Sequence, residues 1–229
     1  KILVAASIDF RIGVVRFNAD GTPDYTFGTA YAYGTPGTPT AGSAGMSYFA
    51  SPILDPATGG RNEYAQGIVE LGTNGGAAWN YKIVVGGTVS LNSNNTDRNI
   101  GLMGVNQDGT LWTGFGSISL PNGFWTANWG GADDNMTGLA KDQYSNITIS
   151  GWSVFGGAGT TPVVHGLDQY GRQGTDGSND YGFYLASSFL PSGYSEFIAT
   201  TKPLYADGDP WHCYVGGFAK TGSSYEYAL

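Results

Sequence analysis

The sequence predicts an all-β fold, a stacked or circular array of about four β repeat units with long inserted loops. Glycine supplies 38 of the 229 residues, far above its usual share of roughly 7%. Aromatic residues reach 14%, whereas charged residues make up only 12%, a balance typical of short strands joined by tight turns. Short phrases also recur along the chain, and no segment has the periodicity and capping of a helix.

The first repeated phrase is an apolar run that ends in small residues. It occurs four times, as Ile2–Ser7, Ile83–Thr88, Ile147–Trp152 and Cys213–Phe218. β-Branched runs that end in glycine suit buried strands whose ends approach another backbone closely. Each run is therefore predicted to be a buried strand with a close backbone contact at its small residues.

The second repeated phrase is a turn that follows each of the first three runs, at 18–21, 106–109 and 168–171. Asp-Gly pairs between alternating apolar residues are strong hairpin signals, with both central residues expected at positive φ. A further predicted strand precedes each later run, at 66–70, 137–141 and 197–201. Each unit is thus predicted to be strand, strand, hairpin and strand over about 65 residues.

The chain is interpreted as one domain over residues 1–229, with units at roughly 1–34, 62–120, 135–182 and 194–229. Loops rich in Gly, Thr, Pro and Asn separate the units, and such long loops are often binding elements. The first unit lacks a leading strand, and the last stops where its third strand is due. Two alternatives follow: the incomplete ends pair and close a ring, or both are cut from a longer repeat array.

Charge and composition exclude several classes of partner. The net charge is -8, and without a Lys/Arg cluster no nucleic-acid partner is expected. No apolar run approaches the roughly 20 residues of a membrane helix, so no membrane span is expected. Cys213 is the one cysteine, which excludes an intrachain disulfide.

The phrase Lys1–Ala6, followed by Val15–Gly21 and Asp24–Gly28, closely resembles the delta-60 β-propeller repeat. That repeat is found in many large secreted or surface proteins of bacteria. The resemblance is good over 1–28, fair over 66–116, weak over 137–171 and partial over 197–219. It implies a propeller-like array of β blades and a secreted, extracellular or cell-surface location. It implies no catalytic residues, because the repeat is structural.

Four residues of a Gly/Asn-rich segment are the candidate binding residues: Phe124, Trp125, Asn128 and Trp129. Exposed aromatic side chains on a rigid β scaffold can stack on sugar rings or anchor a protein partner. The alternative is that the tryptophans cap the core between repeat units.

Metal and catalytic chemistry have little support. Asp133, Asp134, Asp207 and Asp209 offer oxygen ligands for a structural Ca²⁺, but Asp-Gly pairs are also ordinary turn chemistry. No other cofactor is expected. His165 and His212 fall in different units, and buried imidazoles are the simpler interpretation. No catalytic motif occurs, and nothing selects a catalytic pair from the eighteen acidic residues.

The sequence therefore favours a non-enzymatic extracellular or cell-surface structural or binding module. Its expected partners are another protein or a second copy of itself, because an open β edge invites pairing with another chain. The alternative is a carbohydrate-binding or carbohydrate-active propeller that uses the aromatic side chains of the Gly/Asn-rich segment.

Overall fold

The computed structural model describes residues 1–8, 11–28, 30–31, 39–40, 46–48, 63–72, 81–90, 98–116, 123–129, 133–142, 144–154, 160–172, 183–185, 195–201, 214–221 and 224–228. All regular structure in these ranges is β, which confirms the all-β prediction. Within the same ranges no helix is long and apolar enough to cross a membrane.

The described strands form four antiparallel sheets, numbered here in chain order, and one short two-stranded pair. The first sheet contains β1 (Ile2–Ile8), β2 (Arg11–Phe17) and β5 (Met46–Tyr48), and the pair contains β3 (Ala30–Tyr31) and β4 (Pro39–Thr40). The second contains β6 (Tyr64–Leu71), β7 (Lys82–Ser90), β8 (Arg98–Asn106) and β9 (Phe124–Ala127). The third contains β10 (Asp134–Lys141), β11 (Ile147–Val154), β12 (Thr160–Leu167) and β13 (Phe183–Leu185), and the fourth contains β14 (Ser195–Thr201), β15 (Tyr214–Thr221) and β16 (Ser224–Ala228).

The four repeated apolar runs lie at equivalent places in the four sheets, as β1, β7, β11 and β15. Each pairs with the strand that follows it in the chain. In the last three sheets a leading strand, β6, β10 or β14, pairs with the other edge of the run. All three leading strands carry a bulge at the same point, between Ala65 and Gly67 in β6.

The predicted close approach at the small residues is confirmed in the second and third sheets. A Cβ atom on Gly87 would lie 1.7 Å from the carbonyl oxygen of Tyr64, and one on Gly151 would lie 2.1 Å from that of Asn135. Since real side chains never approach a carbonyl so closely, only glycine fits beneath the leading strand at these two places.

The hairpin turns form as predicted but differ in one detail. Gly21, Gly109 and Gly171 have φ of 84°, 89° and 74°, whereas the only non-glycine residue at positive φ in the described chain is Ser145. The expectation of positive φ at both central residues is therefore wrong. A preceding Asp stabilises the turn instead, as where Asp20 Oδ1 accepts hydrogen bonds from the backbone N and Oγ1 of Thr22 at 3.0 and 2.7 Å.

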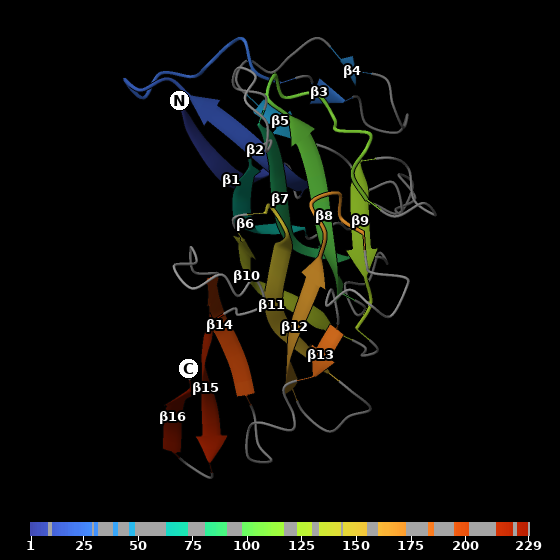
Figure 1. The fold of residues 1–229 in the computed structure, drawn as a ribbon. Coiled ribbons are helices and arrows are strands. Elements are labelled where there is room, and N and C mark those ends of the chain that lie inside the picture. The colour runs from blue at the N-terminus through green and yellow to red at the C-terminus, as the bar shows by residue number, and fades with distance from the viewer. Residues whose placement is uncertain are drawn as a thin grey trace.

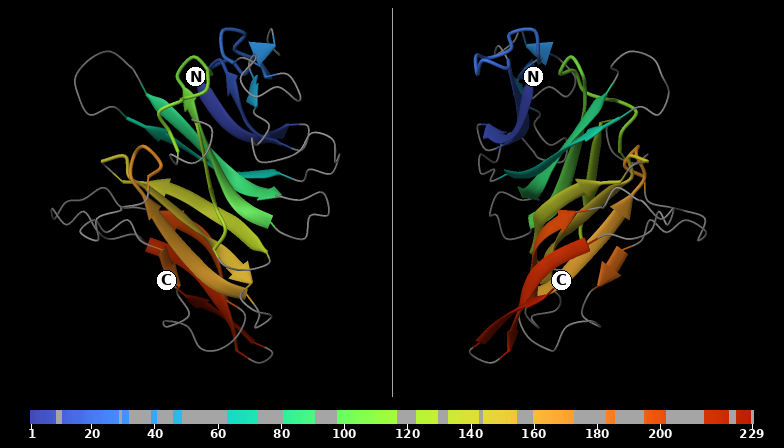
Figure 2. Two further views of the ribbon diagram at one scale, coloured as in Figure 1. Left: turned by 90° about the vertical axis from the view of Figure 1, so that its right-hand side faces the viewer. Right: turned by 60° about the vertical axis from the view of Figure 1, so that its left-hand side comes forward.

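The four sheets stack face to face in chain order, with the N-terminus near one end of the stack and the C-terminus near the other (Figure 1; Figure 2). One hydrophobic cluster lies between the first and second sheets, and a second lies between the second and third. β1 pairs with β2 and β16 pairs with β15, so pairing of the two chain ends, one of the two alternatives, is not found among the described strands. Neither a propeller nor a closed sheet is identified there.

Candidate functional site: the joints between the sheets

The first joint, between the first and second sheets, is made by Phe27 and Gly28. The Phe27 side chain is 1% exposed and packs with Ile12 and Ile83 in the cluster between these sheets. Gly28, at a φ of 94°, donates its backbone N–H to the carbonyl oxygen of Asp108 at 2.9 Å. The end of the first unit is thus attached to the hairpin turn of the second.

The second joint repeats this arrangement between the second and third sheets. Phe115 is 1% exposed, and Gly116, at a φ of 101°, donates its N–H to the carbonyl oxygen of Tyr170 at 2.8 Å. A Cβ atom on Gly171 would lie 2.8 Å from the Phe115 ring. We call the pairs Phe27-Gly28 and Phe115-Gly116 the Phe-Gly latches, because each holds one unit against the next.

Arg16 adds a polar contact to the first joint. Its Nε donates to Asp24 Oδ2 at 2.8 Å, and its Nη1 donates to the carbonyl oxygen of Gln107 in the second unit. The guanidinium lies 4.4 Å from the centre of the Phe27 ring. The hydrogen bonds of this buried guanidinium therefore link the first unit, next to its latch, to the turn of the second unit.

Asp24 is the acceptor at the centre of this contact and is itself buried. Lys1 Nζ lies 2.9 Å from Asp24 Oδ2, and Thr26 Oγ1 donates to Asp24 Oδ1 at 2.7 Å. These hydrogen bonds, that from Lys1 first, lower the pKa of the Asp24 carboxyl. The carboxylate is thus held ionised in a structural role.

The carboxylates of the other turns are also occupied by local hydrogen bonds. Asp108 Oδ1 accepts from the N and Oγ1 of Thr110 at 2.9 and 2.7 Å. Asp142 Oδ1 accepts from the N of Asn146 at 2.7 Å, and Asp168 Oδ1 accepts from the N of Tyr170 at 2.8 Å. These acids shape turns, which is ordinary Asx-turn chemistry.

The candidate calcium ligands are not brought together. Asp133 forms an ion pair with Arg98, and the fully buried Asp134 accepts a hydrogen bond from the N of Trp129 at 2.8 Å. Asp207 and Asp209 lie outside the described residues. In the described ranges no group of three or more His, Cys, Asp or Glu side chains is arranged to hold a metal ion.

The expected exposure of the candidate binding residues is wrong for the tryptophans. Trp125 and Trp129 are 5% and 4% exposed and belong to the cluster between the second and third sheets. Phe124 is half-buried, and of the four only Asn128 is exposed. Phe124–Ala127 form the strand β9, in which Trp125 pairs with Leu102 of β8. The Trp125 side chain therefore packs, with that of Leu102, in the cluster between the second and third sheets.

His165 lies beside both tryptophans. Its ring centroid is 5.1 Å from that of Trp125 in an edge-on contact and 6.4 Å from that of Trp129 in a stacked one. Burial lowers the pKa of His165 to about 4, so the imidazole is neutral near pH 7. His165 is thus a buried imidazole, as expected; His212 lies outside the described residues.

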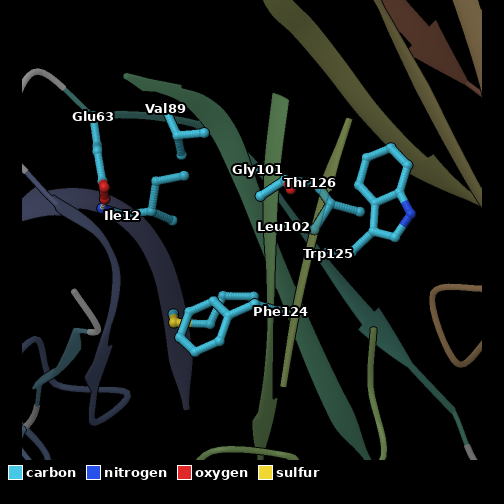
Figure 3. Close-up of a pocket in the computed structure, with 9 residues that line it drawn as sticks. Ile12, Glu63, Val89, Gly101, Leu102, Phe124, Trp125 and Thr126 are labelled. Atoms are coloured by element: carbon cyan, nitrogen blue, oxygen red, sulfur yellow. Dashed lines mark hydrogen bonds between the residues drawn. The ribbon is translucent and has the colours of Figure 1, made fainter. Parts of the chain in front are cut away.

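A small cavity lies between the first and second sheets, lined by residues such as Ile12, Val89 and Phe124 (Figure 3). The carboxylate of Glu63 is its one charged group, and Glu63 Oε2 accepts a hydrogen bond from the N of Ile12 at 3.2 Å. The cavity volume is about 20 Å³, which is room for about one water molecule. It is far smaller than the roughly 300 Å³ of a small-molecule site.

The joints between the sheets therefore contain the buried tryptophans, the two latches and the Arg16–Asp24 ion pair, and they are the candidate functional feature of the described chain. Sequence reasoning found the repeated phrases but missed the role of the Phe-Gly pairs; their recurrence 88 residues apart, at 27–28 and 115–116, was the available signal. No protein-family model matches the chain, and no curated protein matches it.

Proposed function

We propose that this protein is a non-enzymatic structural or binding module, in which the sheets act as blades of a propeller-like array. One observation carries the proposal: the two Phe-Gly latches join successive sheets through the same backbone hydrogen bond. A repeat whose recurring residues hold neighbours together builds a rigid scaffold with an extended surface, which suits a structural or binding role.

The polar residues of the joints support the same conclusion. The carboxylate of Asp24 is committed to Arg16 and Lys1, and those of Asp108, Asp142 and Asp168 are committed to their own turns. A general acid or base needs a carboxylate directed toward a reacting group, whereas these accept hydrogen bonds from neighbouring residues of their own turns or joint.

We further propose an extracellular or cell-surface location, which rests on the resemblance of residues 1–28 to the delta-60 repeat. The propeller-like arrangement rests on that resemblance and on the consecutive antiparallel order of strands within the second, third and fourth sheets. Sugar binding through Trp125 and Trp129 loses its main support, because both indoles are buried between sheets.

Surface biotinylation of intact cells of the source, followed by detection of this chain, tests the location. We expect the chain in the labelled fraction together with known surface proteins and separate from a cytoplasmic marker. Detection only with the cytoplasmic marker would contradict the proposed location.

A carbohydrate panel tests the non-enzymatic role. We expect no turnover of any polysaccharide or glycoside by the purified chain. Turnover that disappears on replacement of a single carboxylate by its amide would overturn the proposal. Glycan binding that is lost in an Asn128→Ala variant would instead support the carbohydrate alternative, since Asn128 is the exposed member of the candidate set.

A further inference from the structure

We propose that the stack opens at the joint between its third and fourth sheets, so that the fourth sheet separates while the first three stay assembled. Two contacts recur at the first and second joints, and the third unit has different residues at the positions that make them. The inference concerns a movement within the scaffold and does not depend on what the scaffold binds. We call the side of a sheet that faces the following sheet its rear face.

The first recurring contact is a hydrogen bond from a leading strand to a hydroxyl of the preceding apolar run. The backbone N of Ala65, at the bulge of β6, donates to Ser7 Oγ at 3.0 Å. The backbone N of Met136, at the bulge of β10, donates to Thr88 Oγ1 at 3.2 Å. Ser7 and Thr88 end the first and second runs, so an equivalent hydroxyl holds the next leading strand at both joints.

The third run ends in Trp152 instead, although β14 carries its bulge at the equivalent point. An indole N–H donates a hydrogen bond but offers no acceptor. Trp152 therefore cannot accept the backbone N–H that Ser7 and Thr88 accept. Its ring lies 5.9 Å from the guanidinium carbon of Arg98, a residue of the second sheet.

The second recurring contact is the Phe-Gly latch. In the first two units the latch lies nine and ten positions after the residue that begins the hairpin turn, as with Asn18 and Phe27-Gly28. The third turn begins at Asp168, and the corresponding residues are Gly177 and Ser178, which lie outside the described ranges. The sequence of the third unit thus supplies no phenylalanine at the latch position.

The rear face of the third sheet is also more polar than the rear faces of the first two. Its run has two hydroxyl residues at positions that are apolar or glycine in the earlier runs: Thr148 and Ser150, against Leu3 and Ala5, and Val84 and Gly86. Leu3 and Ala5 pack against the cluster of the first joint, and Val84 belongs to that of the second.

Thr148 and Ser150 point toward the fourth sheet. Ile147 and Ile149 belong to the cluster shared with the second sheet, and successive side chains of a strand point to opposite faces. Thr148 and Ser150 are 3% and 0% exposed, and Ser150 Oγ has no hydrogen-bond partner among the described residues. A buried hydroxyl without a partner destabilises the contact that buries it, so separation of the fourth sheet relieves this cost.

The fourth sheet packs on the third through β14, which lies against β10, β11 and β12 (Figure 2). Without the hydroxyl contact and the latch, this joint should open at a lower free energy than the other two. Opening uncovers Thr148, Ser150 and Trp152 and leaves both latches in place. The third joint thus acts as a hinge in a stack that is fastened elsewhere.

Thiol-labelling kinetics of a buried cysteine test the proposal in buffer without denaturant. The 229-residue chain carries Cys213→Ser, so that the introduced cysteine is its one thiol. Thr148→Cys reports on the third joint. Val84→Cys is the matched control, because Val84 is 0% exposed at the equivalent position of the second run. We expect Thr148→Cys to be labelled at least about tenfold faster, since a local opening suffices to expose it.

Ser150→Ala places at the third joint the residue that Ala5 provides at the first. It should slow the labelling of Thr148→Cys at least about threefold, because it removes the unpaired hydroxyl. Ser153→Ala is its control: Ser153 is also 0% exposed, and its Oγ likewise has no hydrogen-bond partner in the described part of the chain. Ser153 lies on the opposite face of β11, so this change should leave the labelling rate unaltered.

Equal labelling of Thr148→Cys and Val84→Cys would overturn the proposal, as would an effect of Ser153→Ala as large as that of Ser150→Ala. Amide hydrogen exchange of the unchanged chain needs no variant: β14–β16 should lose protection before β7, β8 and β11. Protection of β14–β16 that lasts as long as that of β7 and β8 would also overturn it. Carbohydrate turnover by the chain would remove the proposed structural role and leave the hinge standing.

Discussion

Single residues decide whether neighbouring units can approach each other. A turn glycine can be required because of its backbone conformation or because a side chain would not fit, and two of the turn glycines illustrate these two reasons. Gly21 and Gly171 both have positive φ, at 84° and 74°. Nothing lies within 4 Å of a Cβ atom added to Gly21, whereas one added to Gly171 would lie 2.8 Å from the Phe115 ring. Gly21 is therefore needed for its conformation alone, and Gly171 for its conformation and its space.

We expect Gly21→Ala to lower the free energy of unfolding by about 1 kcal/mol, the cost of a left-handed alanine. Gly171→Ala should cost a further ~1–3 kcal/mol, because its methyl group also overpacks the second latch. Urea denaturation of both variants beside the unchanged chain measures the difference. Equal losses of unfolding free energy in the two variants would show that the Phe115 ring moves aside for the added methyl group without destabilising the protein.

His165 makes the stability of the protein depend on pH. Its folded-state pKa, lowered by burial to about 4, lies below the unfolded value of about 6.5. The unfolded chain therefore binds more protons between these values, and stability falls as the pH drops from 6.5 toward 4.

We expect a loss of about 2 kcal/mol from His165 between pH 7 and pH 5. A His165→Leu variant should lack this part of the pH dependence, whatever its stability at pH 7. Urea denaturation of both proteins at the two pH values measures the effect. Parallel losses in the two proteins would assign the pH dependence to other groups.

At the scale of elements, the latches join one sheet to the next. Phe27 and Phe115 are both 1% exposed, and truncation of a buried Phe to Ala typically costs about 3–5 kcal/mol. We expect Phe27→Ala and Phe115→Ala to destabilise the protein in this range. Tyr25→Ala is the control, because Tyr25 precedes the first latch by two residues and is 72% exposed.

The unfolding free energy of Tyr25→Ala should change by less than about 0.5 kcal/mol, as measured by urea denaturation in parallel with the latch variants. If Phe27→Ala changed the unfolding free energy as little as Tyr25→Ala, the first latch would contribute little to stability, and the contacts of Arg16 would be the main stabilising contacts of the first joint.

The elements also show how far sequence patterns reach. The repeated runs predicted β1, β7, β11 and β15, because alternating apolar residues and small termini are properties of a strand and its immediate neighbours. β9 was missed because the Gly/Asn-rich composition around it is typical of a loop. Its pairing with β8 depends on residues about 20 positions away, which no local pattern records.

At the scale of the whole molecule, each sheet contacts mainly its neighbours in the stack. The stability of such a repeat array is close to a sum of unit and interface contributions. Damage at one joint should therefore stay largely local.

Amide hydrogen exchange tests this expectation. Phe115→Ala should accelerate exchange in β11 and β12 much more than in β1 and β2, because it loosens the joint between the second and third sheets. Phe27→Ala should show the opposite distribution. Uniform acceleration across all four sheets in either variant would mean that the stack unfolds as one cooperative unit.

The sequence by itself determined the all-β class, the repeated strands, the turns and the need for glycine at Gly87 and Gly151. These follow from strand periodicity, turn chemistry and close approach within one sheet. Only the tertiary structure decided that the sheets form an open stack in the described chain, that Trp125 and Trp129 are buried, and that Ile2 and Val4 are left exposed. Those outcomes depend on which sheet covers which face, and contacts between distant segments determine this through burial of apolar surface.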